Sequence, residues 1–133
     1  YRPLFQLESY QVVVDRGRSG ATESQAVVKI RLEQERFVAV GEGNGPVNAL
    51  DRALKQALKA VDPRIERIHL ADYKVRVIDQ AKGTRAQVRV FIESTDGENT
   101  WGTIGVHENI IEATWEALVD GFEYGLTRMS TQS

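Results

Sequence analysis

One run of sequence signals occurs twice in this chain, and that internal repeat constrains the fold more than any other feature. Leu7 and Tyr10 recur 63 positions later as Leu70 and Tyr73. Further matches join 26–33 to 86–93 at an offset of 60, and Gly41 to Gly102 and Asn48 to Asn109 at an offset of 61. The repeats therefore span residues 7–61 and 70–126, and the 133 residues form a single domain of two related units.

Each repeat begins with residues typical of strands and ends with residues typical of one long helix. Apolar and polar side chains alternate at 26–33, whereas Leu50, Leu54 and Leu58 recur at helical spacing after Pro46. The expected strands are 7–15, 26–33, 37–40, 73–77, 86–93 and 101–106, and the expected helices are 46–61 and 109–126. Residues 16–23 are expected to form a connecting loop, and residues 95–98 a turn.

This order of elements predicts an α+β fold built from a duplicated βββα unit. A unit of about 60 residues with one sheet and one helix leaves apolar surface uncovered. Two such units bury that surface when their helices pack between the two β-sheets. Apolar surface that is still exposed favours self-association, so we expect a dimer.

Composition and charge exclude several kinds of partner and chemistry. Seventeen Lys and Arg against nineteen Asp and Glu give a net charge of -2, which provides no basic surface for nucleic acid or an anionic membrane. The absence of cysteine excludes disulfides, thiolate nucleophiles and cysteine-ligated metal. No apolar run reaches the roughly 18 residues of a membrane span and the chain starts with no signal peptide, so we expect a soluble, cytoplasmic protein. Because the first residue is not Met, we expect a piece of a longer protein or a processed product.

Two histidines, His69 and His107, are the only imidazoles available for catalysis or metal binding. Neither has a second histidine about two to four residues away, as a histidine-based metal site on one element requires. His107 lies close to Glu108 and Glu112, but a solvated residue at the start of a helix explains it. We therefore expect no catalytic residue, no metal site and no cofactor in this chain.

A glycine-rich segment, 41–46, joins the third expected strand to the first helix, and 102–109 takes the same place in the second repeat. Its glycines fit either a tight turn that needs a positive φ or a loop whose backbone approaches a ligand. The repeat favours binding, because helix N-termini present unpaired N–H groups that suit a small carboxylate. Apolar residues beside the two junctions that could line a side-chain pocket are Val47, Ala49, Leu50, Ile104, Val106 and Ile110.

Four segments carry a recognisable pattern: 43–50 (GNGPVNAL), 72–77 (DYKVRV), 83–86 with 88–90 (GTRA and VRV), and 101–113 (WGTIGVHENIIEA). Together they resemble the C-terminal regulatory domain shared by 2-isopropylmalate synthase and citramalate synthase. The resemblance extends from about Leu7 to Leu126, and the WGTIGV and NIIEA stretches are more similar to the citramalate synthase branch.

The resemblance implies a homodimeric domain that binds an end-product amino acid for feedback inhibition in branched-chain amino acid biosynthesis. Isoleucine is the effector in citramalate synthases and leucine in isopropylmalate synthases. The implied effector site lies near the dimer interface and takes residues from both junctions: Gly43, Asn44, Gly45, Pro46, Val47, Ala49, Leu50, Thr103, Ile104, Gly105, Val106, Asn109 and Ile110.

The family's catalytic part is a separate TIM barrel that condenses acetyl-CoA with a 2-oxo acid, using a divalent metal. No residue of this chain matches its metal ligands, so we expect the chain to be catalytically silent and to act on a barrel that precedes it in the same protein. Two alternatives stay open. Instead of an isoleucine-binding domain of a citramalate synthase, the chain could be a leucine-binding domain of a 2-isopropylmalate synthase or a structural dimerisation module without an effector.

Overall fold

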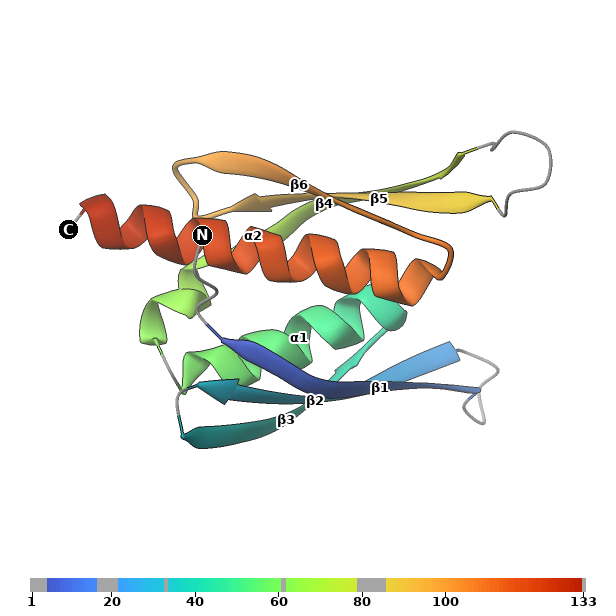
Figure 1. Cartoon of the computed structure of the whole chain (residues 1–133), viewed down its shortest axis with the longest axis horizontal. Coiled ribbons are helices and arrows are strands. Elements are labelled where there is room, and N and C mark those ends of the chain that lie inside the picture. The colour runs from blue at the N-terminus through green and yellow to red at the C-terminus, as the bar shows by residue number, and fades with distance from the viewer. Residues whose placement is uncertain (1–4, 17–21, 33, 61, 79–85, 133) are drawn as a thin grey trace. The chain divides into compact units, whose positions relative to one another are not determined.

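The computed structural model describes residues 5–16, 22–32, 34–60, 62–78 and 86–132. It divides into two compact units, Tyr1–Glu66 and Arg67–Ser133, called unit 1 and unit 2 below. Each unit contains three strands followed by a helix, which confirms the predicted order βββα-βββα (Figure 1).

Unit 1 is a three-stranded antiparallel sheet, sheet A, with a helix against one of its faces (Figure 1). The strands are β1 (Gln6–Arg16), β2 (Thr22–Leu32) and β3 (Glu35–Gly43), with β2 in the centre. The helix is α1 (Pro46–Lys59), and Pro46 stands in its first turn, where the missing N–H of proline costs no hydrogen bond.

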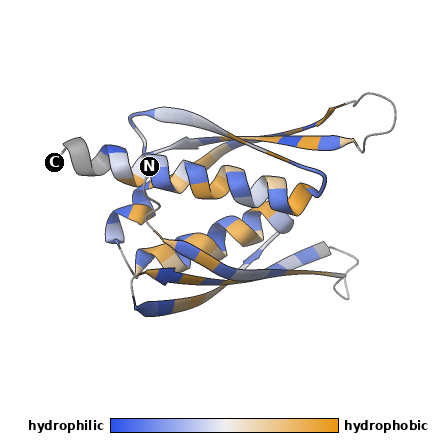
Figure 2. Ribbon diagram, viewed as in Figure 1, coloured by the Kyte–Doolittle hydropathy of each residue, from blue (hydrophilic) through white to orange (hydrophobic). Residues whose placement is uncertain are grey.

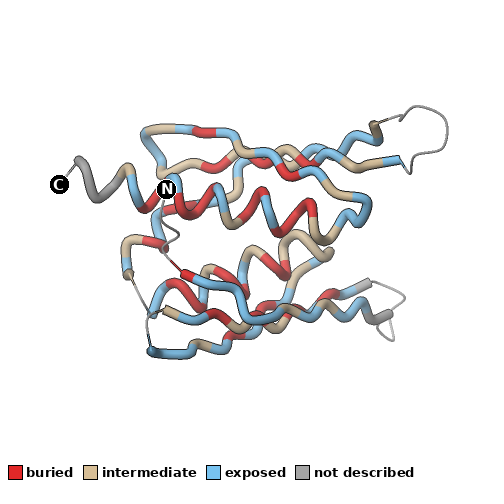
Figure 3. Tube along the Cα trace, viewed as in Figure 1, coloured by how far each residue is buried: buried red, intermediate tan, exposed pale blue. Residues whose placement is uncertain are grey.

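Alternation along β2 explains why α1 covers one face of sheet A. Ala26, Val28 and Ile30 are buried, whereas the residues between them are partly exposed (Figure 3). On α1, the buried residues include Leu50, Leu54 and Leu58, which recur at three- to four-residue spacing along the helix (Figure 2). Burying such an apolar stripe is the main source of stability for a unit of this size.

Unit 2 repeats the arrangement with sheet B and a longer helix. Its strands are β4 (His69–Ile78), β5 (Gln87–Thr95) and β6 (Thr100–His107). They are antiparallel, and β5 lies in the centre of the sheet. The helix is α2 (Ile110–Gln132). Polar contacts anchor α2 to sheet B: the Trp101 indole N–H donates to the carbonyl of Gly121 over 2.9 Å, and the Tyr73 and Thr114 hydroxyls share a hydrogen bond of 3.1 Å.

Strand pairing shows which residues of the two units are equivalent. Tyr10 pairs with Val28 in unit 1, and Tyr73 pairs with Ile92 in unit 2, so β2 and β5 are offset by 64 positions. The same offset relates β3 to β6, because Gly41 lies opposite Ala26 and Gly105 lies opposite Val90. The offsets of 60 and 61 that sequence similarity indicates for these segments are therefore wrong.

Both errors have a simple physical reason. Moving a strand by four residues keeps its alternation in phase, and moving a helix by three residues is close to one full turn. For β2 and α1, apolar pattern alone therefore cannot distinguish offsets of 60 and 61 from 64, and Gly41 at the end of β3 was matched with the offset of the helix that follows it. In the structure, the counterpart of Gly41 is Gly105 rather than Gly102, and the counterpart of Gly45 is Asn109.

Gly41 and Gly105 have the same packing function in their units. A Cβ at Gly41 would lie 2.6 Å from the carbonyl oxygen of Ala49, and it would collide with the backbone nitrogen of Ala53. A Cβ at Gly105 would collide with the carbonyl of Ala113. Glycine at these two places lets each helix lie directly on the third strand of its sheet.

Several element boundaries differ from the sequence prediction. The third strand is longer than 37–40, α1 ends at Lys59, and α2 continues to Gln132. A short 3₁₀ helix at Pro63–Arg67, η1, was not predicted. Residues 16, 22 and 23 of the expected loop belong to strands, and residues 17–21 lie outside the described residues. The turn at 95–98 is confirmed, since the Asp96 carboxylate accepts the N–H groups of Glu98 and Asn99.

Candidate functional site

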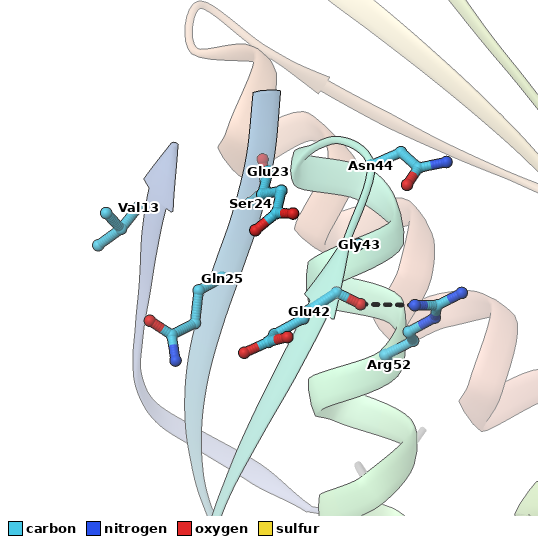
Figure 4. A pocket seen from close by; sticks show the side chains of 8 residues that line it. All are labelled: Val13, Glu23, Ser24, Gln25, Glu42, Gly43, Asn44 and Arg52. Carbon is cyan, nitrogen blue, oxygen red and sulfur yellow. Dashed lines mark hydrogen bonds between the residues drawn. The ribbon is translucent and has the colours of Figure 1, made fainter. Parts of the chain in front are cut away.

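A hollow of about 360 Å³ lies in unit 1 where β2 begins, β3 ends and α1 begins. Side chains from all three strands and from α1 surround it (Figure 4). The lining residues are Val13, Glu23, Ser24, Gln25, Glu42, Gly43, Asn44 and Arg52. The hollow thus lies at the first of the two strand-to-helix junctions.

Ser24 is one of the lining residues, and its hydroxyl is buried on the α1-facing side of β2. The residue is 2% exposed, and its Oγ has no hydrogen-bond partner among the residues that the structure describes. Because Ser24 precedes Ala26 and Val28 on the α1-facing side of β2, the strand holds its side chain on the buried face. An unpartnered buried hydroxyl costs about 1–3 kcal/mol, so a ligand that bonds this oxygen relieves that cost.

The N-terminus of α1 supplies free backbone donors at the same junction. Its N-cap residue is Gly45, with φ -159° and ψ 173°, and no side chain caps the helix. The first helical bond runs from the N–H of Ala49 to the carbonyl of Gly45, which leaves the N–H groups of Val47 and Asn48 without an acceptor inside the helix. These donors and the positive end of the helix dipole favour an anionic group.

The φ of Gly45 rules out one interpretation of the glycine-rich segment. Its backbone is extended, which any residue can adopt, and among the described glycines only Gly97 has a positive φ, at 97°. Gly43 is needed for a different reason: a Cβ there would lie 2.7 Å from the Cβ of Asn48 and 2.8 Å from the nitrogen of Ala49. Around Gly45 nothing lies within 4 Å of such a Cβ, so the backbone is open at this point.

Charged groups of both signs border the hollow. Arg52 reaches from α1 to the end of β3, and its Nη1 donates to the carbonyl oxygen of Glu42 over 2.7 Å (Figure 4). The negative charges are the carboxylates of Glu23 on β2 and Glu42 on β3. A guanidinium and free N–H groups near two carboxylates match a small molecule that carries both a carboxylate and an ammonium group.

Asp51 precedes Arg52 on α1 and is the one strongly perturbed group near this junction among the described residues. Burial raises its pKa to about 6, against the opposing influence of the positive charges on Lys55 and Arg52. Asp51 does not line the hollow, so we treat its titration as a property of the helix rather than of the site.

The junction of unit 2 differs from that of unit 1 at each of these positions. Asn109 replaces Gly45, and its Oδ1 accepts the N–H groups of Ile111 at 2.8 Å and Glu112 at 3.3 Å, which caps α2. Val88 stands where Ser24 stands in unit 1, and Glu116 where Arg52 stands. The Glu116 carboxylate accepts the N–H of Val106, so this junction is capped and negatively charged.

The structure places the thirteen predicted site residues in different environments. Gly43 and Asn44 line the hollow, and Gly45, Pro46 and Val47 form the turn beside them. Ala49 and Leu50 are fully buried in the core of unit 1. In unit 2, Thr103 donates its hydroxyl to the carbonyl of Ala117, Gly105 lies beneath α2, Asn109 is the helix cap, and Ile104, Val106 and Ile110 are exposed.

Sequence reasoning missed six of the eight lining residues: Val13, Glu23, Ser24, Gln25, Glu42 and Arg52. Ser24 had a detectable signal, because it is a polar residue in phase with the apolar positions of β2. Arg52 gave none, since a charged residue on the polar side of a helix is ordinary. Its link to β3 depends on how closely α1 lies to that strand, which the glycine at position 41 permits.

Neither histidine belongs to this hollow. His107 accepts the backbone N–H of Asn109 at its Nδ1, over 2.9 Å, at the start of α2. Within the described part of the chain, no cluster of three or more His, Asp or Glu side chains is arranged to hold a metal ion. In the same residues, neither α1 nor α2 combines the length and apolar character needed to cross a membrane.

Comparison with known proteins gives one matching family. The model of the LeuA allosteric (dimerisation) domain matches residues 1–126. This match covers both units and both junctions.

Among curated proteins, the chain is similar to (R)-citramalate synthases. It is 45% identical to the enzyme of Streptomyces coelicolor over 129 residues and 45% identical to that of Aquifex aeolicus over 128 residues, covering 96% of this chain in each case. A 2-isopropylmalate synthase of Aquifex aeolicus is 32% identical over 103 residues, or 77% of the chain. The chain spans about a quarter of the length of the citramalate synthases, 24% in both cases.

Proposed function

The chain belongs to the LeuA allosteric (dimerisation) domain family, and on this premise we propose that it binds isoleucine as a feedback inhibitor for an (R)-citramalate synthase. Its greater similarity to citramalate synthases than to the 2-isopropylmalate synthase supports isoleucine over leucine. The chain also provides the contact through which two copies of the enzyme associate.

The observation that carries the proposal is the chemistry of the hollow in unit 1 together with that of the helix start beside it. Free N–H groups of Val47 and Asn48, together with Arg52, suit the carboxylate of an amino acid. Glu23 and Glu42 suit its ammonium group, and the unpartnered hydroxyl of Ser24 is a further polar contact. Val13 supplies the apolar contact at the edge of the hollow, where a branched side chain would lie.

The rest of the protein is part of the proposal. The relatives that carry this domain are about four times longer than the chain, which leaves room for a catalytic domain in the same polypeptide. We place there the condensation of acetyl-CoA with a 2-oxo acid, on a TIM barrel, in the cytoplasm. In this arrangement the chain itself carries no catalytic residue and affects the reaction only through the effector.

Inhibition then follows from thermodynamic coupling. An effector shifts the enzyme between two states only by its difference in affinity for them, and such coupling is typically about 1–3 kcal/mol. The hollow is made by the ends of β2 and β3 and the start of α1, so a ligand that bonds all three holds the junction in one arrangement. Because these contacts form only in that arrangement, the ligand binds this state of the enzyme more tightly than the other, as the coupling requires.

Isothermal titration calorimetry of the chain with isoleucine, leucine and valine tests the proposal. We expect binding heat with isoleucine and weaker binding with leucine. Stronger binding of leucine would favour the regulatory domain of a 2-isopropylmalate synthase. If none of the three gives heat or a thermal shift, the chain is a dimerisation module without an effector.

Replacing Gly45 by the helix-capping residue of unit 2 tests whether isoleucine binds at the junction of unit 1. Gly45→Asn introduces a side chain that accepts the N–H groups of Val47 and Asn48, as Asn109 does in α2, and space for it is available. We expect the helix to be stabilised and isoleucine binding to weaken at least about tenfold, because the side chain competes with the carboxylate. Gly97→Asn is the matched control, since Asn tolerates a positive φ and Gly97 lies in the turn of unit 2.

A further inference from the structure

A second cavity of unit 1, here called the α1 groove, lies between β3 and α1 and has a volume of about 460 Å³. All of its lining residues belong to unit 1, and it shares only Glu42 and Arg52 with the hollow described above. The groove therefore borders the proposed effector site but is lined for the most part by other side chains.

Three positively charged side chains line the α1 groove. They are Arg52, Lys55 and Lys59, at positions i, i+3 and i+7 of α1, which places them in a row about 10 Å long on one side of the helix. The lining residues include two carboxylates, those of Glu42 and Glu66. The lining thus carries one positive charge in excess, although the whole chain has a net charge of -2.

The basic row belongs to unit 1 and is not a requirement of the repeated fold. The positions of Arg52 and Lys59 correspond to Glu116 and Glu123 on α2, 64 residues later. Between them lies Asp120, where burial and the charge of Glu116 raise the pKa of the carboxyl group. Because α2 packs on its sheet with acidic residues at these positions, helix packing does not explain the cations of α1.

A carboxylate of the chain itself already pairs with this row. Glu66, in η1, forms an ion pair with Lys59. The hydrogen bond from Lys59, together with the positive charges of Lys59 and Lys55, lowers the pKa of Glu66. The Glu66 side chain is 55% exposed, so an anion from solution can replace it at Lys59. The class of group that the groove holds is therefore an anion.

We propose that the α1 groove binds a phosphate group through Arg52, Lys55 and Lys59. A phosphate group carries about 1.5 to 2 negative charges near pH 7 and several acceptor oxygens, so it can contact several cations of the row at once. Arginine and lysine are the side chains that bind phosphate most often, the first through paired N–H groups and the second as a point charge. Inorganic phosphate and a phosphate ester share this chemistry.

A phosphate bound here should weaken isoleucine binding, and this consequence rests on the proposed function. Arg52 lines both cavities, and its Nη1 donates to the carbonyl oxygen of Glu42, which also lines both (Figure 4). A phosphate in the groove and a carboxylate in the hollow would share one guanidinium and repel each other. Each ligand then lowers the affinity for the other by the same factor.

Calorimetry with inorganic phosphate, pyrophosphate and adenosine 5′-monophosphate, at constant ionic strength, tests the groove without isoleucine. We expect one saturable site, and at least about fivefold weaker binding in the double variant Lys55→Gln/Lys59→Gln. Glu66→Gln should bind about threefold more tightly, because it frees Lys59 and removes a negative charge. A folding defect cannot produce that gain. Tighter binding of adenosine 5′-monophosphate than of both inorganic anions assigns the groove to a phosphate ester, and the reverse order assigns it to the free anion.

The matched control is Lys29→Gln/Lys74→Gln, which removes the same charge from sheets A and B. Lys29 is partly buried like Lys55, and Lys74 pairs with the carboxylate of Asp72 as Lys59 does with Glu66. This variant should bind all three probes as the original chain does. Absence of saturable binding, or an equal loss in both double variants, would show that the groove is not a phosphate site.

A second titration separates the groove from the effector site. With pyrophosphate at saturation, we expect isoleucine to bind at least about threefold more weakly. Unchanged isoleucine affinity would contradict the coupling through Arg52. If isoleucine gives no heat while pyrophosphate binds, the proposed effector fails and the phosphate site stands, so the two failures are distinguishable.

Discussion

At Ser24, the stability of the fold and the proposed binding make opposite demands on one side chain. Its hydroxyl is buried on the apolar face of β2 with no partner in the described structure, at a position that Val88 fills in unit 2. An apolar residue here would satisfy the fold better. In the proposed function, the ligand supplies the hydrogen bond that the fold does not.

Replacing this hydroxyl should therefore have opposite effects on stability and binding. Ser24→Ala removes the unpartnered group, and we expect the free energy of unfolding without ligand to rise by about 1 kcal/mol. Isoleucine binding should weaken by about the value of one hydrogen bond, or roughly three- to tenfold. Chemical denaturation and calorimetry measure the two effects.

The control is Ser94→Ala, which removes another buried serine hydroxyl on the helix-facing side of the central strand of unit 2. This variant should leave isoleucine affinity unchanged. A Ser24→Ala variant that loses stability and binds isoleucine as before would contradict the assignment of Ser24 to the site.

Asp51 makes the stability of the chain depend on pH. Its pKa is raised from 3.8 to about 6 by burial, so the folded chain holds this proton more tightly than the unfolded chain does. The free energy of unfolding contributed by Asp51 is therefore fully present below about pH 4 and falls as the pH rises to about 6. The change is up to about 3 kcal/mol, since one pKa unit corresponds to about 1.4 kcal/mol.

We expect Asp51→Asn to reduce this loss. Denaturation of the original chain and the variant at pH 4, 5, 6 and 7 gives the difference in slope directly. Glu66→Gln is a useful comparison, because the ammonium of Lys59 lowers the pKa of the exposed Glu66 and the sign of its effect is reversed. Equal slopes for the original chain and Asp51→Asn would contradict the raised pKa.

At the scale of the elements, Gly41 and Gly45 have different roles at the same junction, one in packing and the other in the proposed binding. Gly41 lies under α1, where an added Cβ meets the backbone of Ala49 and Ala53, whereas Gly45 is open. Gly41→Ala should therefore cost about 1–3 kcal/mol of stability, and Gly45→Ala should change it by less than about 0.5 kcal/mol. Thermal unfolding of both variants tests this expectation, and a large loss at Gly45 would mean that the turn itself requires glycine.

Sequence pattern predicted the elements well because their signals are local. Alternation at 26–33 and the leucine spacing from Leu50 to Leu58 each need only a few neighbouring residues, and both elements are present in the structure. The equivalence of the units was predicted less well, since Gly41 was matched to Gly102 instead of Gly105. Periodicity repeats within an element, so it cannot define register without the strand pairing.

Only two of the predicted site residues, Gly43 and Asn44, line the hollow of unit 1. The glycine-rich segment identified the junction of unit 1, because turns and helix starts have clear sequence signals. Arg52 and Ser24 reach the hollow through contacts between α1, β2 and β3, and such contacts leave no trace in residue spacing. Ala49 and Leu50, adjacent in sequence to the junction, turn into the core because the helix rotates by about 100° per residue.

At the scale of the whole chain, the two units have one fold but different junctions. The changes from Ser24 to Val88, from Gly45 to Asn109 and from Arg52 to Glu116 each replace a group that suits a carboxylate ligand. In unit 2, Val88 is an apolar side chain on β5, and Asn109 caps α2. The Glu116 carboxylate accepts the N–H of Val106 on β6. The two junctions are equivalent in position, and in the second one the helix cap and the edge of the sheet are bonded by the chain's own side chains.

This asymmetry predicts one isoleucine per chain. If both junctions bound the effector, as their equivalent positions in the repeat imply, calorimetry would give a stoichiometry of two. A carboxylate at the junction of unit 2 would meet the Glu116 side chain and N–H groups already bonded by Asn109, so we expect a single site and a stoichiometry of one. Asn109→Gly should leave this value unchanged while lowering the free energy of unfolding by up to about 1 kcal/mol through loss of the cap. Two sites of similar affinity, or loss of binding in Asn109→Gly with binding intact in Gly45→Asn, would assign the effector to unit 2 instead.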